Sequence, residues 1–226
     1  MFFYDPTFIL LIPVLLLAFY AQSKVKGNYI KYSKIKISSG TTGAEVAINI
    51  LQSNGITDVT VQEIDGTLTD NYNSKKKKLN LSQEVYHGNS IAAISIAAHE
   101  AGHAVQHAEH YAPLGIRTGI FPIANFGSML AFPMFIIGLI LRTPLLMDIG
   151  IILFAGALFF HAVTLPVEFN ASKRALVHLE KNYIANETEM IGARKVLNAA
   201  ALTYVASTLM ALMQFIRLIV LRGSRD

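Results

Sequence analysis

The residues of this chain that could do chemistry are concentrated in one short stretch, His99-Glu100-Ala101-Gly102-His103. In an α-helix, residues four positions apart lie one turn apart on the same face, so His99 and His103 can bind one metal ion together. Glu100 would then lie beside a water molecule on that ion, where a carboxylate can accept and return a proton. The pattern therefore predicts a catalytic zinc site, in which the metal activates water and polarises a carbonyl group.

The surroundings of this stretch argue against a surface helix that carries the pattern by chance. Residues 90–108 are mostly Ala, Ile and Val around the two histidines, which predicts a largely buried helix. Burying two imidazoles and a carboxylate without partners would cost about 1–3 kcal/mol for each unsatisfied group. A bound metal ion would satisfy all three groups.

Two further histidines follow on the same predicted helix. His107 lies about 12 Å along the axis from His99 at 1.5 Å per residue, which is too far to share a metal ion with both histidines of the pattern. The longer zinc pattern, H-E-x-x-H-x-x-G-x-x-H, needs a glycine and a histidine where this chain has Gln106 and Glu109. We therefore expect His107 and His110 to be surface or membrane-interface groups.

A third protein ligand is needed, because a catalytic zinc ion takes three protein ligands and keeps one position open. Glu168 is the candidate, since two histidines and one glutamate form a known ligand set. We expect Glu168 to open a helix on the same side of the membrane as His99 and His103. A carboxylate at a helix start is also stabilised by the helix dipole alone, so the order of residues leaves both interpretations open.

The composition is that of a membrane protein. Of 226 residues, 53% are hydrophobic and only 15% are charged, against a usual charged fraction of about 25%. The chain has no cysteine, which excludes disulfides and thiolate ligands and leaves His, Asp and Glu as metal ligands. The net charge of +4 comes with lysines beside apolar segments, which indicates lipid headgroups as partners and not nucleic acid.

Apolar segments predict where the chain crosses the membrane. Residues 6–21 form an uncleaved anchor helix, because the lysines follow the apolar core where a signal peptide would carry them before it. These lysines place the following segment in the cytoplasm. Residues 119–165 form a transmembrane hairpin, interrupted by Asp148 and His161. The apolar segment 199–221 is long enough to span, but its flanking arginines leave open whether it crosses the membrane or lies at its surface.

The remaining segments predict a portion outside the membrane. Within residues 38–110, the sequence predicts a helix at 41–54, a strand at 59–64 and a short strand at 79–81, in a small antiparallel sheet. The run Lys75 to Lys78 is interpreted as a solvated turn and not as a phosphate contact. The free edge of strand 79–81 could hold an extended peptide across the metal. Residues 166–198 supply the third-ligand helix and a polar segment.

Several of these elements together resemble a known family. They are Asp70-Asn71-Tyr72-Asn73, Leu81-Ser82, the run from Ser95 to Gln106, the hairpin, and the segment LPVEFNAS at 165–172. They resemble the YugP-like neutral zinc metallopeptidases of bacterial membranes, over nearly the whole chain. That family is similar to the HtpX-type proteases, gluzincins in which a hairpin also separates the histidine motif from a glutamate ligand.

The resemblance implies zinc on His99, His103 and Glu168, with Glu100 as general base. It also implies a mainly α membrane protein with a small zincin-like α+β portion, folded as a single domain over 1–226. The HtpX-type pattern has an acidic residue four positions after its glutamate ligand, where it can orient a ligand histidine. This chain has Ser172 there, so the partner of that histidine is open.

The sequence thus favours an integral, multi-pass membrane zinc endopeptidase with its active site at the cytoplasmic face. Its expected partners are the lipid bilayer and an unfolded or membrane-associated polypeptide substrate. A tyrosine could stabilise the oxyanion, and the candidates are Tyr72, Tyr86 and Tyr183. Two alternatives are a non-catalytic scaffold that keeps the fold and a transport component built on His161 and Asp148. Loss of turnover with retained metal in Glu100→Gln would distinguish the protease from both.

Overall fold

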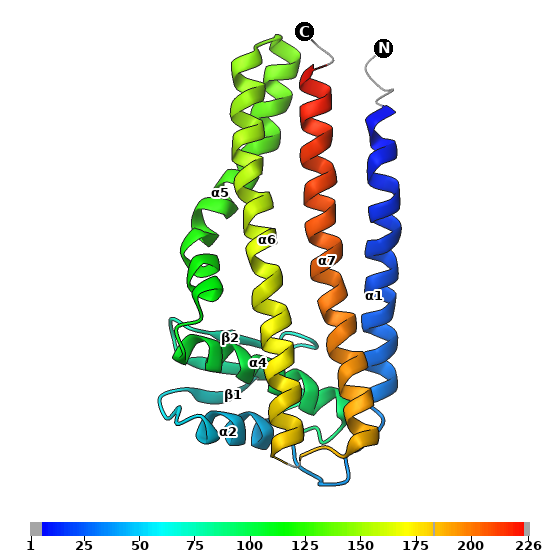
Figure 1. Cartoon of the computed structure of the whole chain (residues 1–226), viewed down its shortest axis with the longest axis vertical. Helices are drawn as coiled ribbons and strands as arrows, with labels where there is room; N and C mark the ends of the chain where they lie inside the picture. Colours follow the sequence, from blue (N-terminus) through cyan, green and yellow to red (C-terminus); the bar gives the residue numbers. More distant parts are fainter. Residues whose placement is uncertain (1–5, 183, 224–226) are drawn as a thin grey trace. The chain divides into compact units, whose positions relative to one another are not determined.

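The computed structural model describes residues 6–182 and 184–223, which form two compact units (Figure 1). Unit 1 takes its described residues from Met1–Ala21, Gly115–Pro166 and Thr203–Asp226, and unit 2 from Gln22–Leu114 and Val167–Leu202. Most described residues are helical, which confirms the predicted mainly α fold class. That the chain 1–226 acts as one domain stays a prediction.

Four long helical segments are apolar enough to cross a membrane. They are the 3-10 turn η1 (Pro6–Leu11) with α1 (Ile12–Tyr32), α5 (Ala112–Leu141), α6 (Pro144–Lys181) and α7 (Glu187–Gly223). Among the described residues these are the only helices that meet the length and hydropathy needed for a span. The sequence left open whether the segment 199–221 crosses the membrane. This segment belongs to α7, which meets both criteria.

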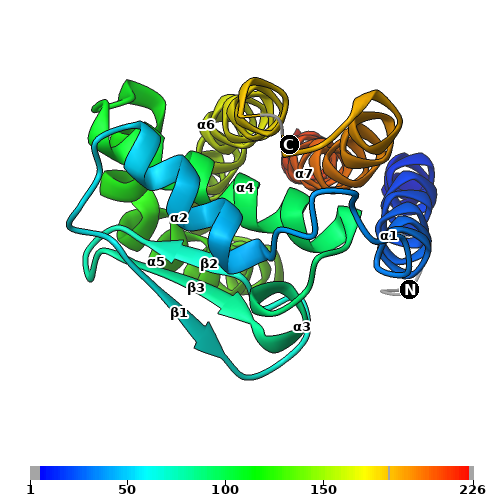
Figure 2. The same cartoon turned by 90° about the horizontal axis from the view of Figure 1, so that it is seen from below.

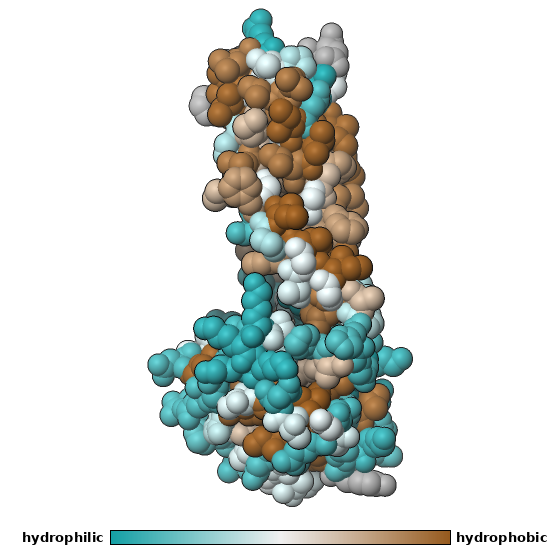
Figure 3. Space-filling view, turned by 90° about the vertical axis from the view of Figure 1, so that its left-hand side faces the viewer, coloured by the Kyte–Doolittle hydropathy of each residue, from teal (hydrophilic) through white to brown (hydrophobic). Residues whose placement is uncertain are grey.

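Unit 1 is packed through small residues. Gly150 on α6 lets the backbone of α5 approach so closely that an added Cβ atom would lie 2.8 Å from the carbonyl oxygen of Ala131. Phe135, Phe154 and Leu218 fill the space beside this contact. Small residues at helix contacts are typical of membrane helices, which lack a hydrophobic driving force between them. In the face shown in Figure 3 the outer surface of unit 1 is largely apolar, whereas unit 2 carries many polar side chains.

Unit 2 combines a three-stranded sheet with helices. Its elements before the membrane helices are α2 (Gly43–Ser53), β1 (Thr60–Ile64), β2 (Asn71–Asn73), β3 (Lys78–Ser82), α3 (Gln83–Tyr86) and α4 (Ile91–Ala108). Figure 2 shows α2 and α4 side by side along the sheet. The two helices begin within two residues of the predicted starts at 41 and 90: Thr42 and Glu45 form a capping box before α2, and Ser90 caps α4. Ile50, Leu81 and Ile94 lie in the shared core.

The sheet is mixed and not antiparallel throughout. The strand order is β1-β3-β2, with β1 and β3 parallel, where the sequence predicted an antiparallel pair, and with β2, a strand that the sequence did not predict, antiparallel to β3. The segment 65–70 carries the chain past β3, and Asp70 then accepts a hydrogen bond of 2.7 Å from the Ser82 backbone N–H. Because β3 is paired on both sides, the expected free edge at residues 79–81 is wrong. The outer strands are β1 and β2.

The lysine run lies in the connection between β2 and β3. Residues 74–77 form the turn, as predicted, and Lys78 begins β3. Lys77 pairs with Asp58, and the backbone N–H of Lys76 donates to Asn73 Oδ1 over 3.0 Å. The run therefore closes a hairpin at the protein surface.

Glu168 does not open a helix, so that expectation is wrong. The helix α6 runs without a break from Pro144 to Lys181 and contains Pro166 in its interior. Proline removes one hydrogen-bond donor but its fixed φ is helical, and here the helix continues through it. Glu168 lies far from the first turn of α6, so the helix dipole does not explain its position.

The helices α4 and α6 meet within unit 2 at Gly102. An added Cβ atom at Gly102 would lie 2.8 Å from the carbonyl oxygen of Ala171. A backbone atom cannot rotate away as a side chain can, so only glycine permits this separation. Gly102 stands between His99 and His103, and Ala171 stands three residues after Glu168. The contact therefore sets the distance between the two segments that carry the candidate ligands.

We predict that Gly102→Ala forces α4 and α6 apart, destabilises unit 2 by about 1–3 kcal/mol and weakens zinc binding. Thermal unfolding and zinc content per chain measure the two effects. Gly27→Ala on α1 is the matched control, because nothing lies within 4 Å of an added Cβ atom there. Its stability and zinc content should equal or exceed those of the wild type. Equal zinc content and stability in Gly102→Ala would refute the role of this contact.

Candidate metal centre

His99, His103 and Glu168 come together in unit 2. One ligand atom from each lies within 4.8 Å of the other two, and within residues 6–182 and 184–223 this is the one such group of His, Asp or Glu able to hold a metal ion. The α4 helix supplies both histidines from successive turns, and their rings meet edge to face with centroids 4.8 Å apart. The α6 helix supplies the carboxylate.

The distances from Glu168 to the two histidines are close to those expected between ligands of a tetrahedral zinc site. Glu168 Oε2 lies 3.2 Å from His99 Nε2 and 3.6 Å from His103 Nε2. With bonds of about 2.0–2.1 Å at tetrahedral angles, ligand atoms around zinc are about 3.3 Å apart. The two measured separations lie on either side of that value. All three ligand atoms lie within 4.8 Å of one another, so movement of their side chains could close them around one ion.

Each histidine also has a partner at its other ring nitrogen. Ser172 Oγ lies 3.2 Å from His99 Nδ1, and Gln106 Oε1 lies 3.0 Å from His103 Nδ1. When Nδ1 carries the proton and donates it to these oxygens, Nε2 keeps its lone pair for a metal. Ser172, which stands where the HtpX-type pattern has its acidic residue, thus contacts one of the two candidate ligand histidines.

The electrostatics of the cluster favour positive charge. Burial alone would lower the pKa of His103, but the hydrogen bond to Glu168 and the charge of Glu100 outweigh it and raise that pKa above its ordinary value. The Glu168 side chain is only 2% exposed. A buried carboxylate is costly unless a cation compensates it, so this site suits a divalent metal ion.

Glu100 lies between the two histidines in sequence and is partly buried. Burial raises the pKa of its carboxyl above the ordinary value, and the charges of His103 and His99 oppose that rise. A carboxyl whose pKa lies closer to neutrality is better suited to take up and release a proton.

The other singled-out histidines and tyrosines lie outside the ligand cluster. His107 Nδ1 lies 2.9 Å from the hydroxyl of Tyr72, and both side chains are partly buried, while His110 is exposed just after α4 ends. Burial raises the pKa of Tyr72 to about 12, so its phenol stays protonated at neutral pH. The ring of Tyr86 stacks edge to face on His87. Tyr183 lies outside the described residues.

Asp148 and His161, the basis of the transport alternative, both belong to α6 within unit 1. They stand 13 positions apart in sequence, which is about 20 Å along a helix. Asp148 accepts a hydrogen bond of 2.9 Å from Arg222 Nε, and His161 lines a small pocket with Phe160 and Asn125. This separation favours two local roles over one shared pathway.

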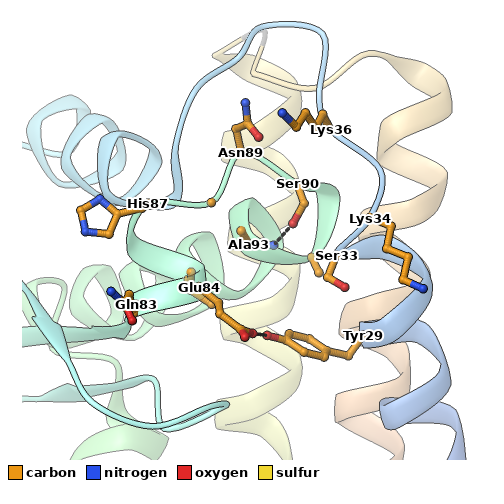
Figure 4. Close-up of a pocket in the computed structure, with 13 residues that line it drawn as sticks. Tyr29, Ser33, Lys34, Lys36, Gln83, Glu84, His87, Asn89, Ser90 and Ala93 are labelled. Carbon is orange, nitrogen blue, oxygen red and sulfur yellow. Dashed lines mark hydrogen bonds between the residues drawn. The ribbon is translucent and has the colours of Figure 1, made fainter.

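A larger pocket of about 730 Å³ lies at the N-terminal end of α4 and holds none of the predicted site residues. Figure 4 shows Tyr29 donating its hydroxyl proton to Glu84, over 2.5 Å, at one side of this pocket. Ser90 accepts a hydrogen bond of 3.2 Å from the backbone N–H of Ala93 at another side. The pocket is therefore formed by the end of α1, by α3 and by the start of α4, whereas both histidines of the metal cluster lie in the middle of α4.

Sequence reasoning missed the polar residues that connect α4 to α6 beyond the ligands. Gln106 donates to the carbonyl oxygen of Val167 over 2.8 Å and to Asn170 Oδ1 over 2.9 Å. Arg174 donates to the same Asn170 oxygen over 2.7 Å and to Glu109 over 2.6 Å. The signal was present, because Gln106 lies three residues after His103 in an apolar helix, and residues three apart share a helix face.

Comparison with known proteins agrees with this centre. Residues 7–223 match the model of a family described as "Putative neutral zinc metallopeptidase". The chain is 50% identical over 213 residues, 94% of each chain, to a Bacillus subtilis (strain 168) protein named "Putative membrane protease YugP". No solved structure matches the chain. Because the family match covers nearly all of its length, this protein belongs to that family of neutral zinc metallopeptidases.

Proposed function

We propose that this protein is an integral membrane zinc endopeptidase, with zinc held by His99, His103 and Glu168 and with Glu100 as its general base. The observation that carries the proposal is the convergence of two imidazole Nε2 atoms and one buried carboxylate from two helices. Three protein ligands with one open position distinguish a catalytic zinc site from a structural one, which closes with a fourth. Glu100 has no purpose in a structural site.

Each residue of this site would have a separate role in peptide hydrolysis. When bound, zinc supplies a Lewis acid that lowers the pKa of water and polarises the carbonyl group of a peptide. Glu100 takes a proton from the water molecule as its oxygen bonds to the carbonyl carbon. When the C–N bond breaks, Glu100 returns that proton to the leaving amine. Glu168 offsets part of the metal's charge, and Ser172 and Gln106 hold the imidazoles in place.

The proposed substrate is an extended segment of a polypeptide, unfolded or associated with the membrane. The outer edge of β2 has no partner strand among the described residues, and α4 packs against β2 and β3. An extended peptide can pair with such an edge through its main chain, which a folded protein cannot offer. The edge of β2 thus takes the role that the sequence suggested for residues 79–81.

We also propose that the centre faces the cytoplasm. Four crossings, by α1, α5, α6 and α7, would place the segments 22–114 and 167–202 on one side of the membrane. That side carries Lys24, Lys26, Lys31, Lys34 and Lys36 directly after the first crossing. Lysine-rich segments beside a span stay in the cytoplasm. Of the two arginines at the end of the last crossing, Arg222 and Arg225, Arg222 lies in the last turn of α7 and is partly neutralised by its pair with Asp148.

We expect Glu100→Gln to retain zinc and to lose peptide cleavage. Both purified proteins, in detergent, should hold about one zinc per chain, and the variant should cut an unfolded reporter protein at least about 100-fold more slowly. Glu168→Gln is the companion variant, and it should lose zinc itself. Cleavage at the wild-type rate by Glu100→Gln would remove the proposed general base. Zinc binding without cleavage in the wild type would favour a non-catalytic scaffold.

The cytoplasmic orientation can be measured with single cysteines, because the chain has none of its own. Lys76→Cys, in the turn between β2 and β3, should react with a membrane-impermeant maleimide only after the cells are permeabilised. Arg142→Cys, exposed between α5 and α6, should react in intact cells. The opposite labelling pattern would overturn the orientation without affecting the zinc site.

A further inference from the structure

We propose that Gln106 is a positioning residue that fixes the tautomer of His103 and ties this ring to the helix that carries Glu168. The inference rests on the proposed zinc site and adds a residue outside the ligand set. Gln106 is completely buried and contacts three groups: His103, the backbone of Val167 and the side chain of Asn170. A buried amide with these contacts, three residues after a candidate metal ligand, can hold the ring of that ligand in place.

The orientation of the Gln106 amide follows from its partners. The carbonyl oxygen of Val167 can only accept, so it must face the amide nitrogen of Gln106. The amide oxygen then faces His103 Nδ1 at 3.0 Å, and an oxygen without hydrogen can only accept. His103 must therefore carry a proton on Nδ1. In the neutral ring this leaves the lone pair on Nε2, the atom that faces Glu168.

The orientation of the Asn170 amide is fixed in the same way by its partner Arg174. Arg174 has only donors, and its Nε atom lies 2.7 Å from Asn170 Oδ1. This oxygen therefore accepts from Arg174 and from Gln106 together. Arg174 is held in turn by Glu109, at 2.6 Å on the far side. This ladder of hydrogen bonds runs from Glu109, just after α4, through Arg174 and Asn170 on α6 to Gln106 and His103 on α4, and it permits one arrangement of donors and acceptors.

The partner of the other ligand histidine imposes no such arrangement. Ser172 Oγ can donate or accept, because its hydroxyl hydrogen rotates. Ser172 therefore stabilises whichever tautomer His99 adopts, whereas Gln106 selects one tautomer of His103. Replacing Gln106 by a residue without an acceptor would leave Nδ1–H of His103 buried and unpaired, which is costly. The metal-binding arrangement of that ring would then no longer be favoured.

The test compares Gln106→Met and Gln106→Leu, which fill space without an acceptor, with Gln106→Glu, which keeps one. Zinc affinity is measured by chelator competition, and the visible spectrum of the Co²⁺-substituted protein reports the ligand geometry. We expect Met and Leu to weaken zinc binding about 10–100-fold and to change the Co²⁺ bands. Glu should recover part of the affinity, because it keeps the acceptor that faces His103 but loses the amide donors to Val167 and Asn170. Gln62→Leu is the matched control, because it removes a glutamine–asparagine hydrogen bond in the sheet.

The outcomes decide whether Gln106 acts as an acceptor for His103 or only stabilises the fold. Wild-type affinity in Gln106→Met, or equal loss in the Met and Glu variants, would overturn the role of the acceptor. Equal loss in Gln62→Leu would show that any buried amide of this kind matters only for stability, and would overturn it too. A wild-type protein that binds no zinc would overturn the proposed function along with this inference. Loss confined to Gln106→Met and Gln106→Leu leaves both standing.

Discussion

The buried carboxylate of Glu168 is the constraint on which the arrangement of unit 2 depends. A charged group that is 2% exposed is tolerated only beside compensating charge or donors, and here the compensation comes from two rings on α4. Those rings can reach it only if α4 and α6 approach closely. Gly102 makes that approach possible, and Ala171 supplies the backbone against which it packs. Packing and charge therefore constrain the same pair of helices at the same point.

The polar groups around this pair are satisfied by one another. His99 has Ser172, His103 has Gln106, and Gln106 has both a backbone carbonyl and Asn170. A buried polar network stabilises its surroundings only when every member is paired. The ladder meets this condition through residues that cannot exchange donor and acceptor roles. A site with little freedom in its partners can hold its ligand atoms close to the geometry that a metal requires.

The chemistry of this site could be read from the sequence, but its supporting contacts could not. His99, Glu100 and His103 were recognisable because their spacing on one helix is local. Before the resemblance was considered, Glu168 could be interpreted as a metal ligand or as a carboxylate stabilised by a helix dipole. The sequence could not decide, because its partners lie 65 or more residues earlier in the chain. Glu168 was expected to open a helix, yet α6 begins at Pro144 and continues through Pro166, since proline's φ suits a helix. The mixed sheet was missed because strand order depends on contacts between segments that periodicity does not report.

The candidate ligand set also constrains how the chain would cross a membrane. His99 and His103 precede the hairpin, and Glu168 follows it, so the three can meet only if residues 115–166 return the chain to the side that it left. An even number of crossings satisfies this condition, and α5 and α6 supply two helices of sufficient length and hydropathy. This argument does not use the distribution of lysines. The ligand geometry thus supports the proposed placement of the segments 22–114 and 167–202 on one side, and the lysines indicate which side it is.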